Sequence, residues 1–436
     1  MLWNETPQAF AEALRGHGLT RAWVVTRRTG EVEASHRALA PLAEAVAAAP
    51  DYGGHEGCFF EIGGESGHLL AAFVHRTRRG QAAGGVRFWS YPTLGDLVTD
   101  GLRLSLAMGQ KSALAGLWWG GGKGVIARRP GADHRDRELR RRVYRDYGRF
   151  LSGLAGCYVA AEDVGTTPED MAEVHVTTRH TTCVPPAVGG SGNPSRLTAT
   201  GVVVAMEAAL DHLGLGGLAG KTVAMQGLGN VASFMIGELT ARGVGGIVGA
   251  DVDAERLDAV RRRHPETPLE LAAVAPGDAS ILAAECDVLA PNAVGAVLNP
   301  ETIPTIRAPI VCGAANNQLA ETRRDAAALQ ARGVVWVPDF LANRMGIVSC
   351  ANEQYGVFEG DPAVLAHLDR DAPHGIFRRT SEVLRRAEES GTTPAEEAER
   401  LAGELAGEPH PIWPDRGRQI IDDLVASGWG DNGREE

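Results

Sequence analysis

Apolar and polar positions follow two different periods along this chain, which indicates a mixture of strands and helices. Residues 58–73 contain short apolar runs separated by GG and SG turns, a pattern that predicts strands of a small sheet. Apolar side chains recur at helical spacing in three segments, 96–108, 137–151 and 199–213. The second half alternates helix-like material with strand-like apolar runs, at 222–225, 246–250, 286–293, 308–316 and 333–339. Because this βαβ rhythm is typical of a parallel, doubly wound sheet, we predict an α/β fold.

The length of 436 residues exceeds what one compact core usually holds, so we expect two domains. The passage VPPAVGGSGNPS, residues 184–195, is rich in proline and glycine and is the best candidate for the connection. We therefore predict a first domain over residues 1–190 and a dinucleotide-binding domain over 191–345. The remainder, 346–436, is charged, rich in alanine and helical in character, and we expect it to pack back toward the first domain.

The composition is that of a globular protein, with 44% hydrophobic and 22% charged residues and no apolar run long enough to span a membrane. A formal net charge of −12 argues against nonspecific binding to nucleic acid. The N-terminus lacks a basic start and an apolar core, so a secretory signal is not expected. Six scattered cysteines form no CxxC pair and no zinc-like spacing, so we predict reduced thiols, no metal site and a cytoplasmic protein.

A glycine-rich turn in the second half has the context of a dinucleotide site. The strand at 222–225 leads into Gly227-x-Gly229-x-x-Ala232 and then into an apolar-periodic helix. The start of this helix, at Asn230 and Val231, offers unpaired N–H groups to a pyrophosphate. Asp251 closes the next strand, 24 residues after Gly227, where an acid accepts hydrogen bonds from the adenosine ribose and repels the extra phosphate of NADP. We therefore predict NAD as the cofactor. The alternative is a sheet of this type that binds nothing.

The segment KSALAGLWWGGGK places two lysines, Lys111 and Lys123, twelve positions apart, the second directly after three glycines. Glycine lacks a Cβ atom, so the backbone can approach a ligand closely and the next side chain can point into a confined space. Burial disfavours the charged form of an ammonium, which is how a lysine becomes a base near neutral pH. A lone GGGK is more often a glycine turn with a solvated lysine. The neighbouring segments change that preference.

Seven segments occur in the order of a known family: GGVRF (84–88), MGQKSALAGLWWGGGKGVI (108–126), AAEDVGTTPEDM (160–171), GNPSRLTATGV (192–202), GLGNVA (227–232), GAANNQL (313–319) and PDFLANRMGIVSCANEQYG (338–356). On these segments the chain resembles the amino acid dehydrogenases that act on glutamate, leucine, phenylalanine and valine, closer to the leucine and phenylalanine branch. The resemblance implies an N-terminal α/β domain for substrate binding and oligomerisation, a doubly wound Rossmann domain for the dinucleotide, and a homo-oligomer.

The same resemblance implies roles for individual residues. Lys111 pairs with the substrate α-carboxylate, and its charge disfavours a charge on Lys123. Asp163 exchanges protons with the amino group, and Lys123 activates the water that attacks the iminium. In the dinucleotide domain, Thr198 binds the nicotinamide carboxamide, Asn316 or Asn317 lies near the nicotinamide ribose, and Asn343 contacts substrate or cofactor.

The positions that resemble the substrate pocket are uncharged. Ala83 precedes Gly84 and Gly85, at the point where the glutamate enzymes place a lysine for the side-chain carboxylate. The other pocket positions are Ala161, Ile347 and Cys350. A second carboxylate would be desolvated and unpaired there, so glutamate is not expected and an apolar or aromatic side chain is.

Two departures from the family pattern bear on the substrate. Trp118-Trp119 stand where the family has a proline or a small residue, and they either pack in the core or floor an enlarged pocket. Arg344-Met345 replace small residues of the family's NAGG. Arg344 adds an anion contact, alters the pocket or points to solvent.

We predict NAD-dependent, reversible oxidative deamination of an apolar or aromatic L-amino acid to the 2-oxo acid and ammonia. The expected partners are these small molecules and further copies of the chain, with no nucleic acid and no membrane. Two alternatives remain open at this point. One is a dehydrogenase for an unusual amino acid in a dedicated biosynthetic route. The other is a catalytically reduced relative that binds NAD or an amino acid.

Overall fold

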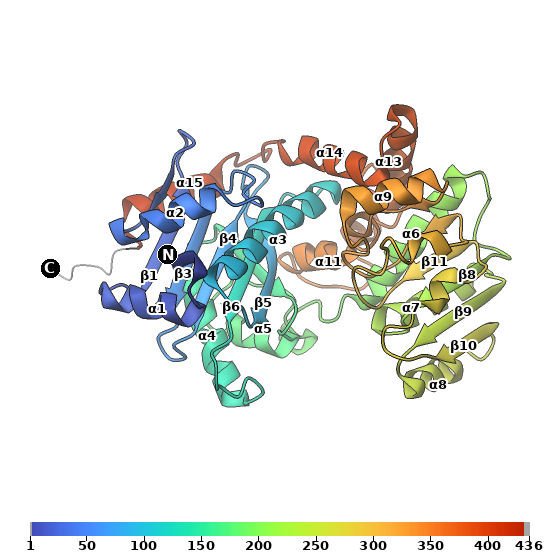
Figure 1. The fold of residues 1–436 in the computed structure, drawn as a ribbon, viewed down its shortest axis with the longest axis horizontal. Helices are drawn as coiled ribbons and strands as arrows, with labels where there is room; N and C mark the ends of the chain where they lie inside the picture. Colours follow the sequence, from blue (N-terminus) through green and yellow to red (C-terminus); the bar gives the residue numbers. More distant parts are fainter. Residues whose placement is uncertain (1, 431–436) are drawn as a thin grey trace. The chain divides into compact units, whose positions relative to one another are not determined.

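The computed structural model describes residues 2–430, and the chain divides into two compact units (Figure 1). The first unit contains the residues up to Asn193, a short piece at Glu353–Val357 and the residues from Gly403 onward. The second unit contains Pro194–Asn352 and Phe358–Ala402. The chain thus first changes units inside the proline- and glycine-rich passage. Residues 358–402, which we expected to return to the first domain with the rest of the C-terminal segment, belong to the second unit.

The first unit is built on a mixed sheet of seven strands in the order β2-β1-β3-β4-β6-β5-β7. Its strands are β1 (Arg21–Thr26), β2 (Val32–Ala34), β3 (Gly57–Ile62), β4 (Leu69–Val74), β5 (Ala82–Trp89), β6 (Gly120–Ala127) and β7 (Tyr158–Glu162). Strand β6 runs antiparallel to β4, whereas β5 runs parallel to both β6 and β7. Strands from distant parts of the sequence therefore meet at the centre of this sheet.

Helices cover both faces of the first sheet, and each face has its own apolar core. One face packs against α1 (Pro7–Gly16), α2 (Ala40–Ala47) and α3 (Leu94–Leu114). The other face packs against α4 (Arg137–Gly153), α5 (Pro168–His175) and α15 (Arg416–Ala426). Helix α3 begins with a capping box, because Thr93 and Asp96 each accept a hydrogen bond from the other's backbone N–H. The C-terminal helix α15 thus belongs to the first unit.

The second unit is built on a six-stranded parallel sheet in the order β10-β9-β8-β11-β12-β13. Its strands are β8 (Thr222–Gln226), β9 (Gly246–Asp251), β10 (Leu269–Ala273), β11 (Val288–Pro291), β12 (Ile310–Val311) and β13 (Val335–Trp336). All neighbouring strands pair in parallel. Counted from β8, this is the 3-2-1-4-5-6 order of the dinucleotide-binding sheet. The predicted α/β fold with a doubly wound parallel sheet is confirmed.

The helices of the second unit are α6 (Ser195–His212), α7 (Asn230–Ala241), α8 (Ala254–Arg263), α9 (Thr322–Ala331), α10 (Asp339–Ala342), α11 (Met345–Glu353), α12 (Pro362–Leu365), α13 (Ile376–Ser390) and α14 (Pro394–Ala406). Helix α6 packs against α7 and α13. The last residue of α11 and the last turn of α14 are assigned to the first unit. Within residues 2–430, no helix has the length and apolarity needed to cross a membrane.

The hydrophobic pattern of the sequence did not predict strands β5 and β6. Their sequences, AAGGVRFW and GGGKGVIA, are rich in glycine, and glycine is depleted in strands because it offers no side chain for packing. Nearly every residue in them is buried. Close backbone packing therefore replaces side-chain packing in these two central strands.

Candidate active site

Lys123 lies in the middle of β6 and is 3% exposed. Its register partner in β4 is Phe73, whose ring packs beneath α3 close to Gly101. Paired residues of neighbouring strands point to the same side of a sheet, so Lys123 projects on the side covered by α3. Lys111 lies in the last turn of α3 and is half-buried. The two lysines of the GGGK segment therefore belong to one side of the first sheet.

The glycines before Lys123 allow protein to pack against protein. A Cβ atom on Gly121 would lie 2.3 Å from the carbonyl oxygen of Ser105 in α3. A Cβ atom on Gly84 in β5 would lie 1.8 Å from the carbonyl oxygen of Gly122. At these positions the missing Cβ atoms therefore make room for neighbouring backbone. The glycines let α3 and β5 lie directly on the backbone of β6, which keeps Lys123 away from water.

Asp163 follows the end of β7 and accepts a hydrogen bond from Lys123, with Nζ 2.7 Å from Oδ2. The contact depends on Gly85, because a Cβ atom there would lie 2.6 Å from the Cβ of Asp163. The hydroxyl of Thr166 accepts a hydrogen bond from the Asp163 backbone N–H and donates one to its carbonyl oxygen. The carboxylate is thus held beside the lysine by a rigid turn. The structure brings the two predicted catalytic residues into direct contact.

Burial controls the charge balance of this pair. It lowers the pKa of the Lys123 amine more than the attraction of Asp163 raises it, and the charge of Arg87 lowers it further. Burial alone would raise the pKa of the Asp163 carboxyl. The charges of Lys123 and Arg87, with hydrogen bonds from Lys123 and from the Val164 backbone, outweigh that effect and lower it. The site therefore combines an ionised carboxylate with an amine that loses its proton more readily than a solvated lysine.

Arg87 is the residue of this site that the sequence pattern did not single out, although it lies in the GGVRF segment. Its Nε donates to the same Asp163 oxygen as Lys123, at 3.1 Å. Its Nη1 donates to both oxygens of Asp100 in α3, at 3.1 and 2.8 Å. The hydroxyl of Tyr91 also donates to Asp100, at 2.7 Å. Arg87 therefore connects the catalytic carboxylate to α3 and supplies a second cation beside Lys123.

The sequence alone distinguishes Lys111 and Lys123 from the other basic residues, because lysine is rare in this chain. Only three of the 43 lysine and arginine residues are lysines, and the third is Lys221. Arginine stays protonated in proteins, whereas a buried lysine can lose its proton. A chain that otherwise uses arginine thus keeps lysine at the position where proton transfer is proposed.

The four uncharged positions that the resemblance assigns to substrate binding are divided between the two units. In the first unit, Ala83 is 1% exposed in β5, and Ala161 in β7 pairs with Gly85. In the second unit, Ile347 and Cys350 are 7% and 6% exposed on α11. Their spacing of three residues puts them on one face of that helix. None of these four side chains offers a charge to a second substrate carboxylate.

The two tryptophans differ in environment. Trp119 is buried, whereas Trp118 is 42% exposed and packs against the Arg79 guanidinium, 4.4 Å from its ring centre. The ring of His410 also contacts Trp118 edge-on, with centroids 5.6 Å apart. Trp118 therefore belongs to a surface cluster with the C-terminal segment of the first unit.

Arg344 and Met345 are both fully buried in the second unit. The Arg344 guanidinium donates a hydrogen bond to the backbone carbonyl of His374, just before α13. The side chain of Met345 packs against α6 at Gly201. Of the alternatives left open for Arg344, exposure to solvent is excluded. The arginine acts as a link between the start of α11 and the start of α13.

The glycine-rich turn of the second unit has open space beside it. Gly227 has a φ of +84°, a left-handed conformation that favours glycine. At Gly229, which caps α7, an added Cβ atom would meet no heavy atom within 4 Å. Among the described residues, no side chain caps this helix end. The first N–H groups of α7, at Asn230 and Val231, therefore retain hydrogen-bonding capacity for an anion such as a pyrophosphate.

Asp251 lies at the end of β9 and is 5% exposed. Its Oδ2 accepts the backbone N–H of Leu228 at 2.7 Å, and its Oδ1 accepts that of Asp253 at 3.0 Å. Burial opposes its ionisation, but these hydrogen bonds and the nearby Arg256 outweigh burial and lower its pKa. Asp251 is therefore an ionised carboxylate that also holds the glycine-rich turn in place. The Arg256 guanidinium also donates long hydrogen bonds to both oxygens, at 3.4 and 3.3 Å.

Three other predicted cofactor contacts lie in the second unit. Asn343 is 5% exposed, and its Nδ2 donates to the side-chain oxygen of Asn316 at 2.8 Å. Asn317 has a φ of +53° and donates its backbone N–H to Asp339. Thr198 lies in the first turns of α6 with its hydroxyl facing Gly346. The structure thus brings Asn316 and Asn343 together.

A buried lysine–carboxylate pair in one unit and a Rossmann-type sheet with an open glycine turn in the other define a dinucleotide-dependent dehydrogenase. Family models agree. Residues 64–180 match the Glu/Leu/Phe/Val dehydrogenase dimerisation domain, and residues 189–402 match Glutamate/Leucine/Phenylalanine/Valine dehydrogenase. The chain belongs to this family. It is an amino acid dehydrogenase, an oxidoreductase with a nicotinamide cofactor.

Individual relatives support the same assignment. The chain is 38% identical to a leucine dehydrogenase of Bacillus subtilis over 78% of this chain and 88% of that one. It is 37% identical to a valine dehydrogenase of Streptomyces coelicolor over 83% and 94% of the two chains. Among solved structures, L-tryptophan dehydrogenase from Nostoc punctiforme matches with a TM-score of 0.68 and 29% identity, over 81% and 96%.

Proposed function

We propose that the enzyme catalyses the NAD-dependent, reversible oxidative deamination of an apolar or aromatic L-amino acid to its 2-oxo acid and ammonia. The observation that carries this proposal is the buried contact between Lys123 and Asp163. The uncharged side chains at Ala83, Ala161, Ile347 and Cys350 support an apolar substrate, as do relatives named for leucine, valine and tryptophan.

In the proposed reaction, Lys111 binds the α-carboxylate of the amino acid through charge attraction. The ionised Asp163 takes a proton from the substrate ammonium, which frees the nitrogen lone pair. A bound nicotinamide cofactor would supply the acceptor for the hydride that leaves Cα. Lys123, as the neutral amine, then takes a proton from the water that attacks the iminium carbon. Collapse of the resulting carbinolamine breaks the C–N bond and releases ammonia and the 2-oxo acid.

Arg87 is proposed to act as a positioning residue. It donates a hydrogen bond to Asp163 and is itself anchored by Asp100. Its fixed charge favours the ionised carboxylate and the neutral amine, which are the two forms the reaction needs. Arginine suits this role because it stays protonated and does not compete with Lys123 or Asp163 as a proton acceptor.

We infer that the cofactor is NAD rather than NADP. The support is Asp251, an ionised acid at the end of β9 that would repel a phosphate on the adenosine ribose. Arg256 lies nearby, but its guanidinium is already paired with Asp251 and Asp253, at 3.3 and 3.6 Å. The preference is measured as the ratio of kcat/KM for the two cofactors. A higher value with NADP would contradict the inference.

We further propose that the first unit carries the substrate carboxylate and the contacts of a homo-oligomer, and that the second unit carries the dinucleotide. The match of residues 64–180 to a dimerisation domain supports the first assignment. The mass of the enzyme in solution, measured by light scattering, tests it. A monomer at micromolar concentration would contradict it.

The experiment that tests the main proposal is turnover of Lys123→Ala, followed at the NADH absorbance band with leucine, valine, phenylalanine and tryptophan. We expect kcat to fall by roughly 10³-fold, the scale of a lost proton-transfer group. The matched control is Lys221→Ala, which removes a lysine that forms an ion pair with Asp287 in the second unit. Turnover by Lys123→Ala at the wild-type rate, or no wild-type activity on any of the four substrates, would overturn the proposal.

A further inference from the structure

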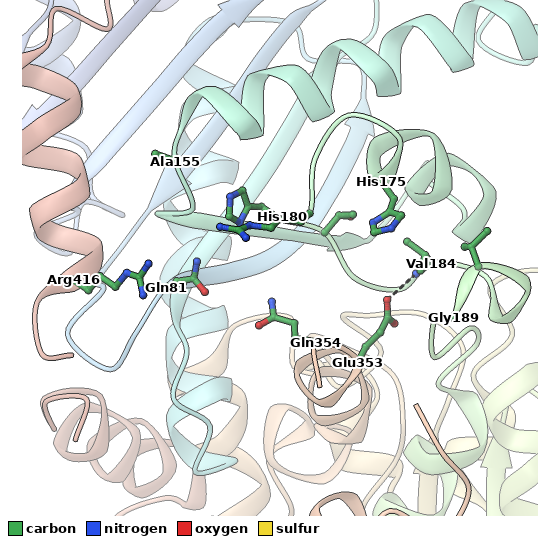
Figure 2. A pocket seen from close by; sticks show the side chains of 12 residues that line it. Gln81, Ala155, His175, His180, Val184, Gly189, Glu353, Gln354 and Arg416 are labelled. Carbon is green, nitrogen blue, oxygen red and sulfur yellow. Dashed lines mark hydrogen bonds between the residues drawn. The ribbon is translucent and has the colours of Figure 1, made fainter. Parts of the chain in front are cut away.

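The first unit contains a cavity of about 430 Å³ that none of the proposed catalytic residues lines (Figure 2). Gln81, immediately before β5, and Ala155, shortly before β7, form one part of its wall. Asp163 lies beyond the opposite end of β7, and a strand of five residues spans roughly 15 Å. The cavity is therefore separate from the Lys123–Asp163 pair, although both belong to the same sheet.

The cavity wall carries more positive than negative charge. Arg179 and Arg416 both line it, and neither has a carboxylate within 4.0 Å in the described part of the chain. The guanidinium of Arg416 instead lies over the ring of Trp413, 5.2 Å from its centre. The imidazoles of His175 and His180 add hydrogen-bonding groups. Figure 2 shows Arg416 and Gln81 toward one end of the cavity and His175 toward the other, so its polar groups are spread along its length.

Glu353 is the one acidic residue among the lining side chains, and its carboxylate already accepts hydrogen bonds. Glu353 accepts hydrogen bonds from the backbone N–H groups of Cys183, Val184 and Ser191, at 2.9, 3.3 and 2.9 Å, and from the Ser191 hydroxyl at 2.5 Å. Four neutral donors therefore satisfy this carboxylate, and among the described residues it forms no ion pair with Arg179 or Arg416. Another lining residue, Thr181, is 6% exposed, and its hydroxyl oxygen has no hydrogen-bond partner among the described residues.

We propose that this cavity is a binding site for a small organic anion with at least two acidic groups, carboxylates or phosphates. The volume lies within the range of pockets for small ligands, and two arginines without carboxylate partners provide the charge. The ligand also contacts two first-unit segments that lie close to points where the chain changes units. Val188 and Gly189 precede the crossing at Asn193, and Glu353 and Gln354 follow the crossing at Asn352. A bound anion therefore ties together two first-unit segments, each of which adjoins one of the four points where the chain passes between the units.

The test is calorimetric titration of the full-length enzyme with citrate and, separately, with inorganic pyrophosphate. NADH is present at saturation, so that the dinucleotide turn is occupied. The variant Arg179→Ala/Arg416→Ala removes both cavity arginines. We expect it to weaken binding at least tenfold, about 1.4 kcal/mol. The relative affinities of the two probes decide whether the natural ligand carries carboxylates or phosphates.

The matched control is Arg135→Ala/Arg137→Ala, which removes two exposed arginines elsewhere in the first unit and leaves the same net charge. This control is expected to bind like the wild type. Thr181→Val, which removes only the hydroxyl without a partner, is expected to weaken binding without lowering the unfolding temperature. Equal binding by the cavity variant and the wild type, or no binding of either probe up to about 10 mM, would overturn the proposal.

Discussion

The chain uses two glycine-rich segments in opposite ways. In β6 of the first unit, the positions beside Gly121 and Gly122 are filled by protein, so the glycines exist to let α3 and neighbouring strands approach. In the turn before α7 of the second unit, the position beside Gly229 is empty. The same amino acid thus permits close packing around Lys123 in one region and leaves open space at Gly229 in the other.

The two glycine-rich segments also differ in their electrostatic effects. The packed glycines of β6 exclude water from Lys123, and burial then lowers its pKa. The open turn leaves the first N–H groups of α7 exposed, which provides a partial positive charge for an anion. The lysine is therefore sensitive to any change in packing, whereas the turn is sensitive to any group that occupies its free space.

The largest expected effect is on Gly121. In Gly121→Ala, the added methyl group meets the carbonyl oxygen of Ser105 at 2.3 Å, and a backbone atom cannot move aside. We expect a loss of about 3 kcal/mol or more in the free energy of unfolding, measured with urea. Gly217→Ala, where nothing lies within 4 Å, is the control and is expected to match the wild type. A stable Gly121→Ala protein would disprove the packing role.

The second-largest effect is expected on the pH dependence of activity. Arg87→Met removes a cation that disfavours the protonated amine of Lys123, so the lysine pKa rises. The pKa of Asp163 rises as well, because Arg87 also favours its ionised form. Both working forms then require a higher pH. We expect the ascending limb of kcat/KM against pH to move to higher pH, with roughly 10- to 100-fold lower activity at pH 7.

The control for this shift is Arg103→Met. Arg103 pairs with the same Asp100 at 3.1 Å, but its side chain is 63% exposed and does not touch Asp163. Its pH profile should coincide with that of the wild type. If Arg87→Met lost activity equally at every pH, its role would be structural rather than electrostatic.

A smaller effect is expected at the open glycine. Gly229 has a φ of −68°, which alanine adopts without strain, so Gly229→Ala tests occupied space alone. We expect an unchanged unfolding temperature and a KM for NAD raised about tenfold, equivalent to about 1.4 kcal/mol. The KM for the amino acid, measured at saturating NAD, serves as the internal control. An unchanged KM for NAD would show that no ligand approaches this position.

The smallest effect is expected at Arg344, which is fully buried in the second unit. Methionine has a similar volume, and replacing a buried charge with an apolar residue is often close to neutral. Arg344→Met should therefore change the free energy of unfolding by less than about 2 kcal/mol. The ratio of kcat/KM for leucine and tryptophan should stay the same. A reversed preference would place Arg344 among the residues that select the substrate.

The sequence predicted structure correctly where neighbouring residues alone define the element. The strand, turn and helix around Gly227 were recognisable because their order and spacing follow from how a parallel sheet presents a helix end. It missed β5 and β6 because the hydrophobic pattern of a strand depends on side chains, and glycine has none. Arg87 was also missed, because a basic residue at the end of a strand is ordinarily a solvated side chain.

The order of the amino acids by itself determined the family, the parallel sheet of the second unit and the candidate pair Lys123 and Asp163. Only the tertiary structure decided that Arg87 shares the carboxylate with Lys123, that the glycines of β6 face protein, and that Arg179 and Arg416 line one cavity. The reason is physical. Burial and charge–charge interactions depend on distances between residues far apart in the chain, such as 87 and 163, and those distances exist only once the sheet has formed.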